Sequence, residues 1–307
     1  MKALITGSEG FAGKYMRHEL EDHGYLVTGV DLVSEKNTVV QDLLDTRSVE
    51  ELIKGERPDV IIHLAGQADV ALSWKIPQKT FEINVLAAVN ILEAVRKYCA
   101  SCRVVLVGSA DQYGSLGSAG INVTESIPLS PTTPYGVSKM AQEEIASVYA
   151  SAYGLLVCMT RSFNHTGAGQ RTGFMVPDFA SGIAAVEAGH ATTIRVGNLE
   201  TKRDLTHVKD VVRAYRLIAE KGIPGSVYNV GSGNSYSARN VLDRLLTMAR
   251  CDVKVEQDVS RMRPVDTPEI RCCHDRLTED TGWLPEIVLD DILGDVLNYY
   301  RERENAK

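Results

Sequence analysis

Short runs of β-branched and aliphatic residues alternate with longer segments of helical period through the first half of the chain. The short runs predict β-strands at Ala3–Thr6, Leu26–Val30, Val60–Leu64, Val104–Val107 and Leu155–Arg161. The longer segments carry apolar residues at three- and four-residue spacing and predict helices at Phe11–His23, Phe81–Tyr98 and Pro134–Tyr153. Strands that alternate with crossover helices predict an α/β fold with a doubly wound parallel sheet.

The pattern becomes less regular after Arg161. It predicts strands at Thr193–Val196 and Val227–Val230, and helices at Val176–Gly189, Val208–Lys221, Ala238–Ala249 and Ile292–Glu304. The simplest division places residues 1–165 and 207–235 in the domain with the large sheet. Residues 166–206 and 236–307 then form a smaller C-terminal α/β lobe.

Composition narrows the class of protein. The 307 residues are 44% hydrophobic with a net charge of −7, which suits a globular chain and disfavours nucleic acid as a partner, because phosphate-backbone binding needs a concentrated cationic face. No apolar run is long enough to span a membrane, and the chain enters a strand directly after Met1, so we expect a cytoplasmic protein. Six cysteines include the pair Cys99 and Cys102 without a second pair, so no metal site is expected.

A glycine-rich loop connects the first strand to the first helix in the segment Thr6-Gly7-Ser8-Glu9-Gly10-Phe11-Ala12-Gly13. Gly7, Gly10 and Gly13 suit a tight turn, close backbone approach to a pyrophosphate, and helix-to-strand packing. The helix that opens at Phe11 offers free N–H groups to phosphates. This position between a strand and a helix predicts a dinucleotide site.

Asp31 ends the second strand, where a carboxylate accepts hydrogen bonds from an adenosine ribose and repels a 2′-phosphate. It therefore favours NAD(H) over NADP(H). Lys36, in the loop that follows, keeps NADP(H) as an alternative.

Two further short segments follow strands at the same predicted edge of the sheet. They are Asp42 with Leu43, and Leu64 with Ala65 and Gly66. Ligands of open α/β sheets bind at the carboxyl ends of the strands, so we assign these residues to the cofactor site. Ordinary loop residues would give the same pattern.

Tyr135 and Lys139 stand four residues apart and therefore lie on one face of their helix. A lysine ammonium beside a phenol lowers the tyrosine pKa towards neutrality, as proton transfer requires. Ser109, at the end of the strand before, supplies a hydroxyl that can polarise a carbonyl. The spacing alone also fits a core tyrosine with an exposed lysine.

Taken together, the Gly-x-x-Gly-x-x-Gly loop, Ser109 and Tyr135-x-x-x-Lys139 resemble the extended short-chain dehydrogenase/reductase family over the whole chain. The resemblance implies a Rossmann domain with a smaller sugar-nucleotide domain. It further implies a nicotinamide cofactor and a homodimer built on a four-helix bundle. Ser109, Tyr135 and Lys139 are the implied catalytic residues.

Motifs in the second half resemble the GDP-sugar branch of that family. They are the segments 161–167, 196–204 and 263–266, which contain Asn164, Asn198, Arg203, Arg263 and Asp266. The resemblance implies that these residues bind the substrate. Guanidinium groups suit bidentate contact with a diphosphate. A turn at Asn164 and an ion pair between Arg203 and Asp204 are the structural alternatives.

The residue at position 111 separates two activities within this branch. The 4,6-dehydratases resembled here place a glutamate two residues after the serine or threonine, where it removes a proton from the sugar. This chain has the shorter Asp111, which we expect to contact the sugar. The resemblance then implies reduction of the C4 ketone of GDP-4-keto-6-deoxy-mannose to GDP-rhamnose, with a proton from Tyr135. A dehydratase, an epimerase and a non-catalytic dinucleotide sensor are the alternatives.

Overall fold

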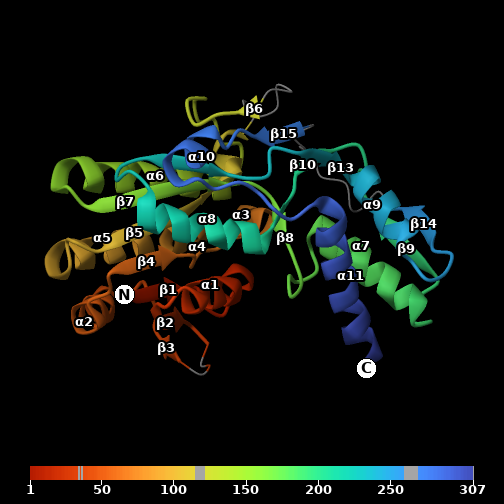
Figure 1. Ribbon diagram of the computed structural model, residues 1–307, viewed down its shortest axis with the longest axis horizontal. Helices are drawn as coiled ribbons and strands as arrows, with labels where there is room; N and C mark the ends of the chain where they lie inside the picture. The colour runs from red at the N-terminus through yellow and green to blue at the C-terminus, as the bar shows by residue number, and fades with distance from the viewer. Residues whose placement is uncertain (34, 36, 115–121, 259–268, 307) are drawn as a thin grey trace.

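A seven-stranded parallel sheet forms the centre of the larger lobe in this computed structural model, which describes residues 1–306 apart from 34, 36, 115–121 and 259–268 (Figure 1). In spatial order its strands are β12 (Val227–Val230), β7 (Leu156–Ser162), β5 (Arg103–Ser109), β4 (Val60–His63), β1 (Lys2–Thr6), β2 (Leu26–Asp31) and β3 (Thr38–Val40). The order reverses at β1, which pairs with β2 on one side and β4 on the other. Ligands of such sheets bind beyond the carboxyl ends of the strands at this reversal.

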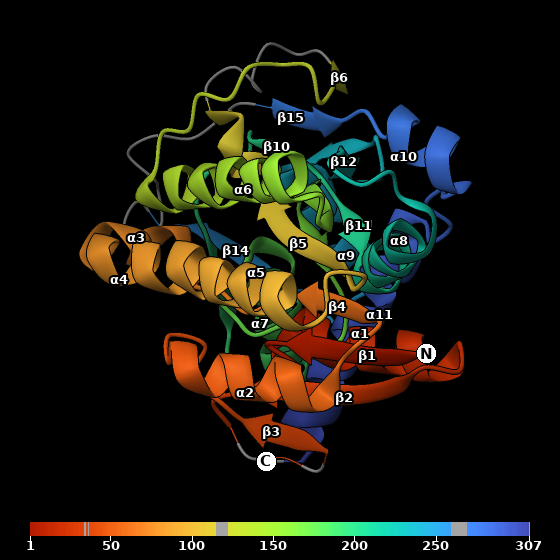
Figure 2. The same ribbon diagram turned by 90° about the vertical axis from the view of Figure 1, so that its left-hand side faces the viewer.

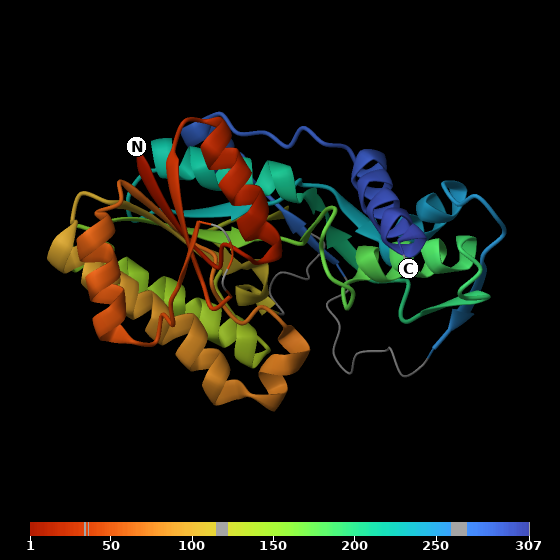
Figure 3. The same ribbon diagram turned by 90° about the horizontal axis from the view of Figure 1, so that it is seen from below.

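Helices cover both faces of the sheet, so its central strands are continuous apolar runs (Figure 3). On one face α1 (Phe11–Asp22) packs beside α8 (Val208–Lys221), and α10 (Asp275–Thr281) packs against α8. On the other face lie α2 (Thr46–Glu56), α5 (Ala87–Tyr98) and α6 (Pro134–Tyr153) (Figure 2). Of these helices, α2 packs against α5, and α5 packs against α6. Each face has its own buried apolar core.

The segment between β4 and α5 is divided into several short helical pieces. They are α3 (Val70–Lys75), α4 (Pro77–Phe81) and a π-helical turn, η1 (Glu82–Leu86), which runs directly into α5. A π turn inserts an extra residue into a helix and is frequent at functional sites. The helix predicted over 81–98 therefore consists of the end of α4, the π turn and α5.

The smaller lobe is built mainly from C-terminal segments. Its core lies among α7 (Met175–Glu187), α9 (Ala238–Thr247) and α11 (Leu289–Asn305), with a parallel pair formed by β9 (Thr193–Val196) and β14 (Lys254–Gln257) at its edge. A four-stranded sheet lies between this core and the larger lobe, in the order β13 (Ser235–Ser237), β10 (Lys202–Asp204), β15 (Glu269–Cys272) and β6 (Asn122–Val123).

The chain passes between the two lobes several times. Two of these crossings, β8 (His165–Thr166) and β11 (Thr206–His207), form a short parallel pair. A third, between β12 and β13, is held by the buried carboxylate of Asp204, which accepts from the backbone N–H groups of Ser232 at 2.8 Å, Gly233 at 2.8 Å and Cys272 at 3.0 Å. The crossings are therefore hydrogen-bonded to one another or to shared side chains.

The predicted fold class is confirmed, and the predicted strands of the large sheet agree with the structure to within one or two residues. The division at 165, 206 and 235 stays a prediction. Within the described residues, no helix has both the length and the apolar composition required to cross a bilayer. The cytoplasmic location is likewise a prediction from the sequence.

Candidate active site

The glycine loop has the close packing that its sequence predicts. Gly7 has a φ of +72°, and a Cβ there would lie 2.8 Å from the Ala65 nitrogen. A Cβ on Gly13 would overlap the Gly7 carbonyl, so only glycine allows α1 to approach β1 this closely. Gly10 precedes α1 without a side-chain hydrogen bond to the helix N–H groups. The N-terminus of α1 can therefore receive a phosphate.

Asp31 lies beside this loop at the end of β2. One carboxylate oxygen accepts from the Glu9 backbone N–H at 2.9 Å, and the other accepts from the Leu32 N–H at 2.7 Å. Asp42 follows β3 and bonds the Leu44 N–H at 2.9 Å. The Leu43 side chain is buried in the core of this face, so it contributes to packing.

The turn after β4 lies close to α6, the helix that carries Tyr135 and Lys139. Leu64 donates its N–H to the Thr6 carbonyl at 3.1 Å, and Ala65 donates to the Thr6 hydroxyl at 3.3 Å. A Cβ on Gly66 would lie 3.5 Å from Lys139 Nζ and 3.0 Å from the amide oxygen of Asn84. Leu64, Ala65 and Gly66 thus connect the glycine loop with the predicted catalytic residues.

Ser109, Tyr135 and Lys139 come together at the carboxyl end of β5. Tyr135 is the second residue of α6, whose start is fixed by Thr133 capping the Gly136 N–H at 3.0 Å and by Pro134 in the first turn. The Ser109 hydroxyl lies close enough to the Tyr135 phenol to favour its ionised form and so to oppose the rise in its pKa. Lys139 lies one turn further along α6, where its ammonium donates to the Val107 carbonyl at 2.7 Å and to Gln142 at 2.9 Å.

The ionisation of this pair differs from the sequence-based expectation. Burial and the nearby charge of Asp111 raise the pKa of Tyr135 well above its ordinary value, and the Ser109 hydroxyl offsets only part of this effect. Burial lowers the pKa of Lys139 to about 8. The ammonium is directed at Val107 and Gln142, so it does not lower the pKa of the phenol in this structure. The tyrosine is therefore held as a neutral acid.

Sequence reasoning did not find Asn84, which lies in the π turn and is completely buried. Its amide accepts from the Gln67 N–H at 2.8 Å and donates to the Gln67 carbonyl at 3.1 Å and to the Ser138 hydroxyl at 2.8 Å. It thereby joins the turn after β4 to α6. No local spacing distinguishes this asparagine, because its partners come from distant segments.

A buried network of hydrogen-bonded side chains holds the backbone at Ser109. The Ser109 N–H donates to Gln112 at 2.8 Å, and Gln112 donates to Glu143 at 2.6 Å. Glu143 in turn forms a buried ion pair with Arg161 at 2.6 Å. Arg161 also donates to the Tyr113 hydroxyl at 2.9 Å. The backbone that carries Ser109 is therefore fixed by side chains from α6 and β7.

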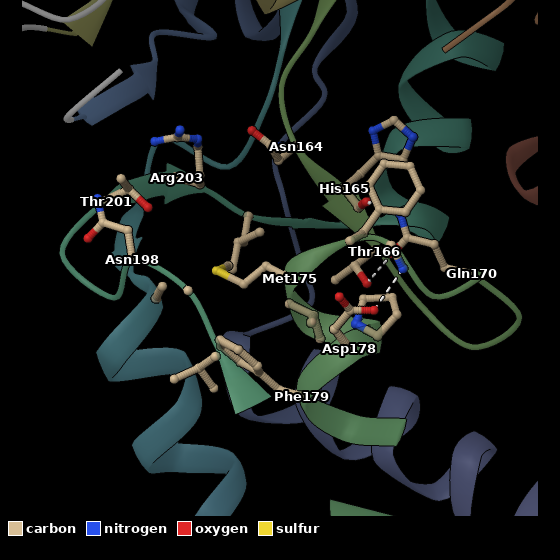
Figure 4. A pocket seen from close by; sticks show the side chains of 18 of the residues that line it. Asn164, His165, Thr166, Gln170, Met175, Asp178, Phe179, Asn198, Thr201 and Arg203 are labelled. Carbon is tan, nitrogen blue, oxygen red and sulfur yellow. Dashed lines mark hydrogen bonds between the residues drawn. The ribbon is translucent and has the colours of Figure 1, made fainter. Parts of the chain in front are cut away.

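A cavity of about 370 Å³ opens in the smaller lobe (Figure 4). Three residues predicted to bind substrate line it, namely Asn164, Asn198 and Arg203. Arg203 lies on β10, the strand between β13 and β15, and donates to the Lys202 carbonyl at 2.8 Å. Asn198 accepts from the Glu200 N–H at 3.0 Å. Met175, Phe179, Gln170 and Thr201 also line the cavity and were not predicted.

The remaining predicted substrate residues are placed differently. Asp111 lies in the short helical turn η2 (Ala110–Gln112), close enough to Tyr135 to raise its pKa, and its N–H donates to the Ser109 hydroxyl at 3.2 Å. Arg263 and Asp266 lie outside the described residues, as does Lys36. The described part of the chain contains no cluster of three or more metal-ligating side chains.

Comparison with known proteins agrees with this geometry. Residues 4–296 match the family model described as GDP-mannose 4,6 dehydratase. The chain is 33% identical over 306 residues to the GDP-6-deoxy-D-mannose reductase of Pseudomonas aeruginosa, with 98% of each chain covered. It is 26% identical to the GDP-mannose 4,6-dehydratase of Yersinia enterocolitica over 96% of this chain and 92% of that one.

Solved structures give the same grouping. RMD from Pseudomonas aeruginosa complexed with NADPH superposes with a TM-score of 0.89 at 32% identity, covering 98% of this chain and 99% of the other. The UDP-glucose 4-epimerase of Thermus thermophilus in complex with NAD gives 0.88 at 27% identity, covering 98% and 99%. The chain therefore belongs to the GDP-mannose 4,6-dehydratase family within the extended short-chain dehydrogenases/reductases.

Proposed function

We propose that this protein reduces the C4 ketone of GDP-4-keto-6-deoxy-D-mannose to give GDP-D-rhamnose, with NADH as its preferred cofactor and NADPH as the alternative. The observation that carries the proposal is that Ser109, Tyr135 and Lys139 meet at the carboxyl end of β5, in a chain similar over its whole length to a reductase of this sugar class. Reduction needs a protonated phenol at the start of the reaction. Proton removal from a sugar hydroxyl, with which dehydratases and epimerases begin, needs the phenolate.

The residues present fit a nicotinamide dinucleotide. Gly7, Gly10 and Gly13 leave the N-terminus of α1 open to a pyrophosphate, and a Cβ at Gly7 or Gly13 would fill this cradle. Asp31 lies where it can bind the adenosine ribose. Lys139, whose ammonium lies close to Gly66, would bind the nicotinamide ribose. When bound in its reduced form, the cofactor supplies the hydride that is added to C4.

The protein supplies the proton and orients the ketone. The Tyr135 hydroxyl donates its proton to the C4 oxygen as negative charge develops there, and Ser109 hydrogen-bonds the same oxygen. Gln112 and Glu143 hold the Ser109 backbone in place during this step. Burial, together with the charge of Asp111, raises the pKa of the phenol, and we propose that Asp111 contacts the sugar hydroxyls.

The smaller lobe would bind the GDP group. Asn164, Asn198 and Arg203 surround the cavity, and we propose that Arg203 binds the diphosphate. Arg263 and Asp266 are proposed to complete this site from outside the described residues. Residues 1–165 with 207–235 would then bind the cofactor, and 166–206 with 236–307 the sugar nucleotide, except that α10 packs against α8 and β12 of the larger lobe.

The second candidate function is that of a nucleotide-sugar 4,6-dehydratase or an epimerase. The family model and the relatives at 26% identity favour it. In either case the cofactor is oxidised and reduced within one turnover, so added NADH is not consumed. Asp111 in place of the longer glutamate argues against the dehydratase.

One assay separates these reactions. Enzymatically prepared GDP-4-keto-6-deoxy-mannose and NADH are mixed with the purified protein, and NADH oxidation is followed together with mass spectrometry and NMR of the product. We expect one NADH consumed per sugar reduced, with GDP-rhamnose as the product. Conversion of GDP-mannose to the keto sugar, or of UDP-glucose to its epimer, without NADH consumption would replace the proposal by the second candidate.

We also propose that the protein forms a homodimer through a four-helix bundle of α5 and α6 from each subunit. Apolar side chains on this face of the larger lobe are exposed, with Leu86 at 51%, Val148 at 51% and Tyr153 at 55%. Light scattering after size exclusion should give twice the mass of the chain. Val148→Lys should give the monomer, whereas a wild-type monomer would contradict the proposal.

A further inference from the structure

A second acidic residue, Glu9, adjoins Asp31, which is proposed to bind the cofactor. Its backbone N–H donates to the Asp31 carboxylate at 2.9 Å, so the two acidic residues are joined where the glycine loop meets the end of β2. The Glu9 side chain is only 14% exposed. Its carboxylate is therefore a fixed part of the loop.

The Glu9 carboxylate is held by several donors. One of its oxygens accepts from the Thr38 hydroxyl at 2.5 Å and from the Ser8 hydroxyl at 3.0 Å, and it forms an ion pair with Arg17 at 3.4 Å. Burial opposes ionisation, but these hydrogen bonds and the charges of Arg17 and Lys14 outweigh it and lower the pKa of Glu9. The side chain carries a full negative charge at neutral pH.

Arg17 is built into the same site from α1. Its guanidinium is 15% exposed, and it passes over Gly29 of β2 so closely that a Cβ at that position would overlap it. It donates to the Thr38 hydroxyl at 3.1 Å and to the Asn37 carbonyl at 3.5 Å. A cation thus lies at the adenosine end of the proposed cofactor site, and Glu9 neutralises it.

We infer that Glu9 is a second determinant of cofactor choice, because its carboxylate acts with Asp31 against a 2′-phosphate and keeps Arg17 from binding one. The inference rests on the proposed cofactor site. A 2′-phosphate bound near Asp31 would be repelled by the Asp31 carboxylate and by the Glu9 carboxylate of the adjoining loop, whereas an arginine in this region is what accommodates the phosphate in NADP-binding proteins. Guanidinium groups pair well with phosphate when no carboxylate already occupies them.

A purely structural role for Glu9 predicts a different outcome. Glu9 could serve only to attach β3 to the loop through Thr38. Glu9→Gln keeps an acceptor for Thr38 and Ser8 but removes the charge. If attachment were the whole role, the ratio of NADH to NADPH affinity would stay constant in this variant, and a thermal melt would report any loss of the attachment.

The test measures binding of NADH and of NADPH separately by calorimetry, with no sugar present, so it is independent of whether the keto sugar is reduced. We expect the wild type to bind NADH more tightly. Glu9→Gln should lower the ratio of NADH to NADPH affinity by about tenfold, equivalent to 1.4 kcal/mol. In the double variant Glu9→Gln with Arg17→Met, the ratio of NADH to NADPH affinity should rise again by at least about threefold over that of Glu9→Gln alone. This rise is equivalent to roughly 0.65 kcal/mol.

Two controls define the result. Glu21→Gln removes the same charge from an exposed position at the far end of α1 and should leave the ratio unchanged. Asp31→Ala should lower the ratio independently. An unchanged ratio in folded Glu9→Gln, or tighter NADPH binding by the wild type, would overturn the inference. If the double variant has the same affinity ratio as Glu9→Gln alone, the part of the inference in which Glu9 keeps Arg17 from binding a phosphate is wrong.

Discussion

Replacement of Arg161 by methionine should destabilise the protein strongly, because it leaves the Glu143 carboxylate buried without its counter-charge. The two side chains are each 7% exposed and meet through two parallel hydrogen bonds, at 3.0 and 2.6 Å. After the substitution, Gln112 is the remaining donor to this carboxylate among its described partners, at 2.6 Å. Breaking one side of a buried pair costs about 3–5 kcal/mol.

The size of the pair's effect can be converted into a melting temperature. At about 2.1 cal/mol/K per residue, unfolding of the 307-residue chain has an entropy of about 0.65 kcal/mol/K. A loss of 3–5 kcal/mol therefore lowers Tm by roughly 5–8 °C. The assay is a thermal melt followed by circular dichroism, at fixed protein concentration and without cofactor.

An exposed pair provides the matched control. Arg47 and Glu51 lie 3.1 Å apart on α2, with side chains 89% and 68% exposed. Arg47→Met removes the same charge and should change Tm by less than about 1 °C, because exposed i,i+4 pairs contribute little. If the Tm of Arg161→Met lies within 2 °C of that of the wild type, the reasoning about the buried pair is wrong. If Arg161→Lys has the same Tm as the wild type, the reasoning about the two parallel hydrogen bonds of the arginine is wrong.

Three further predictions concern the site directly. Tyr135→Phe should keep its cofactor affinity in calorimetry but lose reduction by a factor on the order of a hundred or more, because the proton donor is removed; near-normal turnover would refute its role. Arg203→Ala should weaken GDP binding about ten- to a hundredfold with NADH binding unchanged, whereas loss of both ligands together with a lower Tm would identify a structural arginine. Because burial lowers the pKa of Lys139 to about 8, the folded protein releases this proton before the unfolded chain does, so the contribution of Lys139 to stability should rise between about pH 8 and 10.5. Denaturant unfolding of wild type and Lys139→Met across this range checks it, and a parallel pH dependence of the two proteins would contradict it.

The elements that sequence reasoning located best are those specified by local chemistry. The helix over 134–153 agrees with its predicted bounds: Thr133 and Pro134 marked its start in the sequence, and the structure ends it at Gly154 in the left-handed region. The glycine loop was recognised for the same reason, since its strand and helix are adjacent in the chain. Local signals of this kind depend on a few neighbouring residues.

The parts that sequence reasoning missed depend on distant partners. The strands of the four-stranded sheet are two to four residues long, and Arg203 of β10 pairs with Tyr236 and Ile270, which are far away in the sequence. The π turn around Asn84 exists because its amide bonds Gln67 and Ser138. Periodicity over residues 81–98 cannot reveal such an interruption.

The ionisation of Tyr135 was predicted with the wrong direction for a related reason. Its spacing from Lys139 indicates proximity, but burial and the charge of Asp111 determine the pKa in the structure. Neither quantity can be read from the interval of four residues. Motif spacing therefore identifies the participants, and the fold determines their protonation.

The repeated passage of the chain between the lobes limits how the protein can be cut or recombined. The crossings at β8 and β11 are paired, and Asp204 bonds the crossing after β12 as well as Cys272 of β15. Within the described residues, each lobe is built from several separate stretches of chain. A graft of the substrate lobe from a relative would need several junctions to match at once, so new sugar specificity is more accessible by substitution within the lobe than by exchanging it.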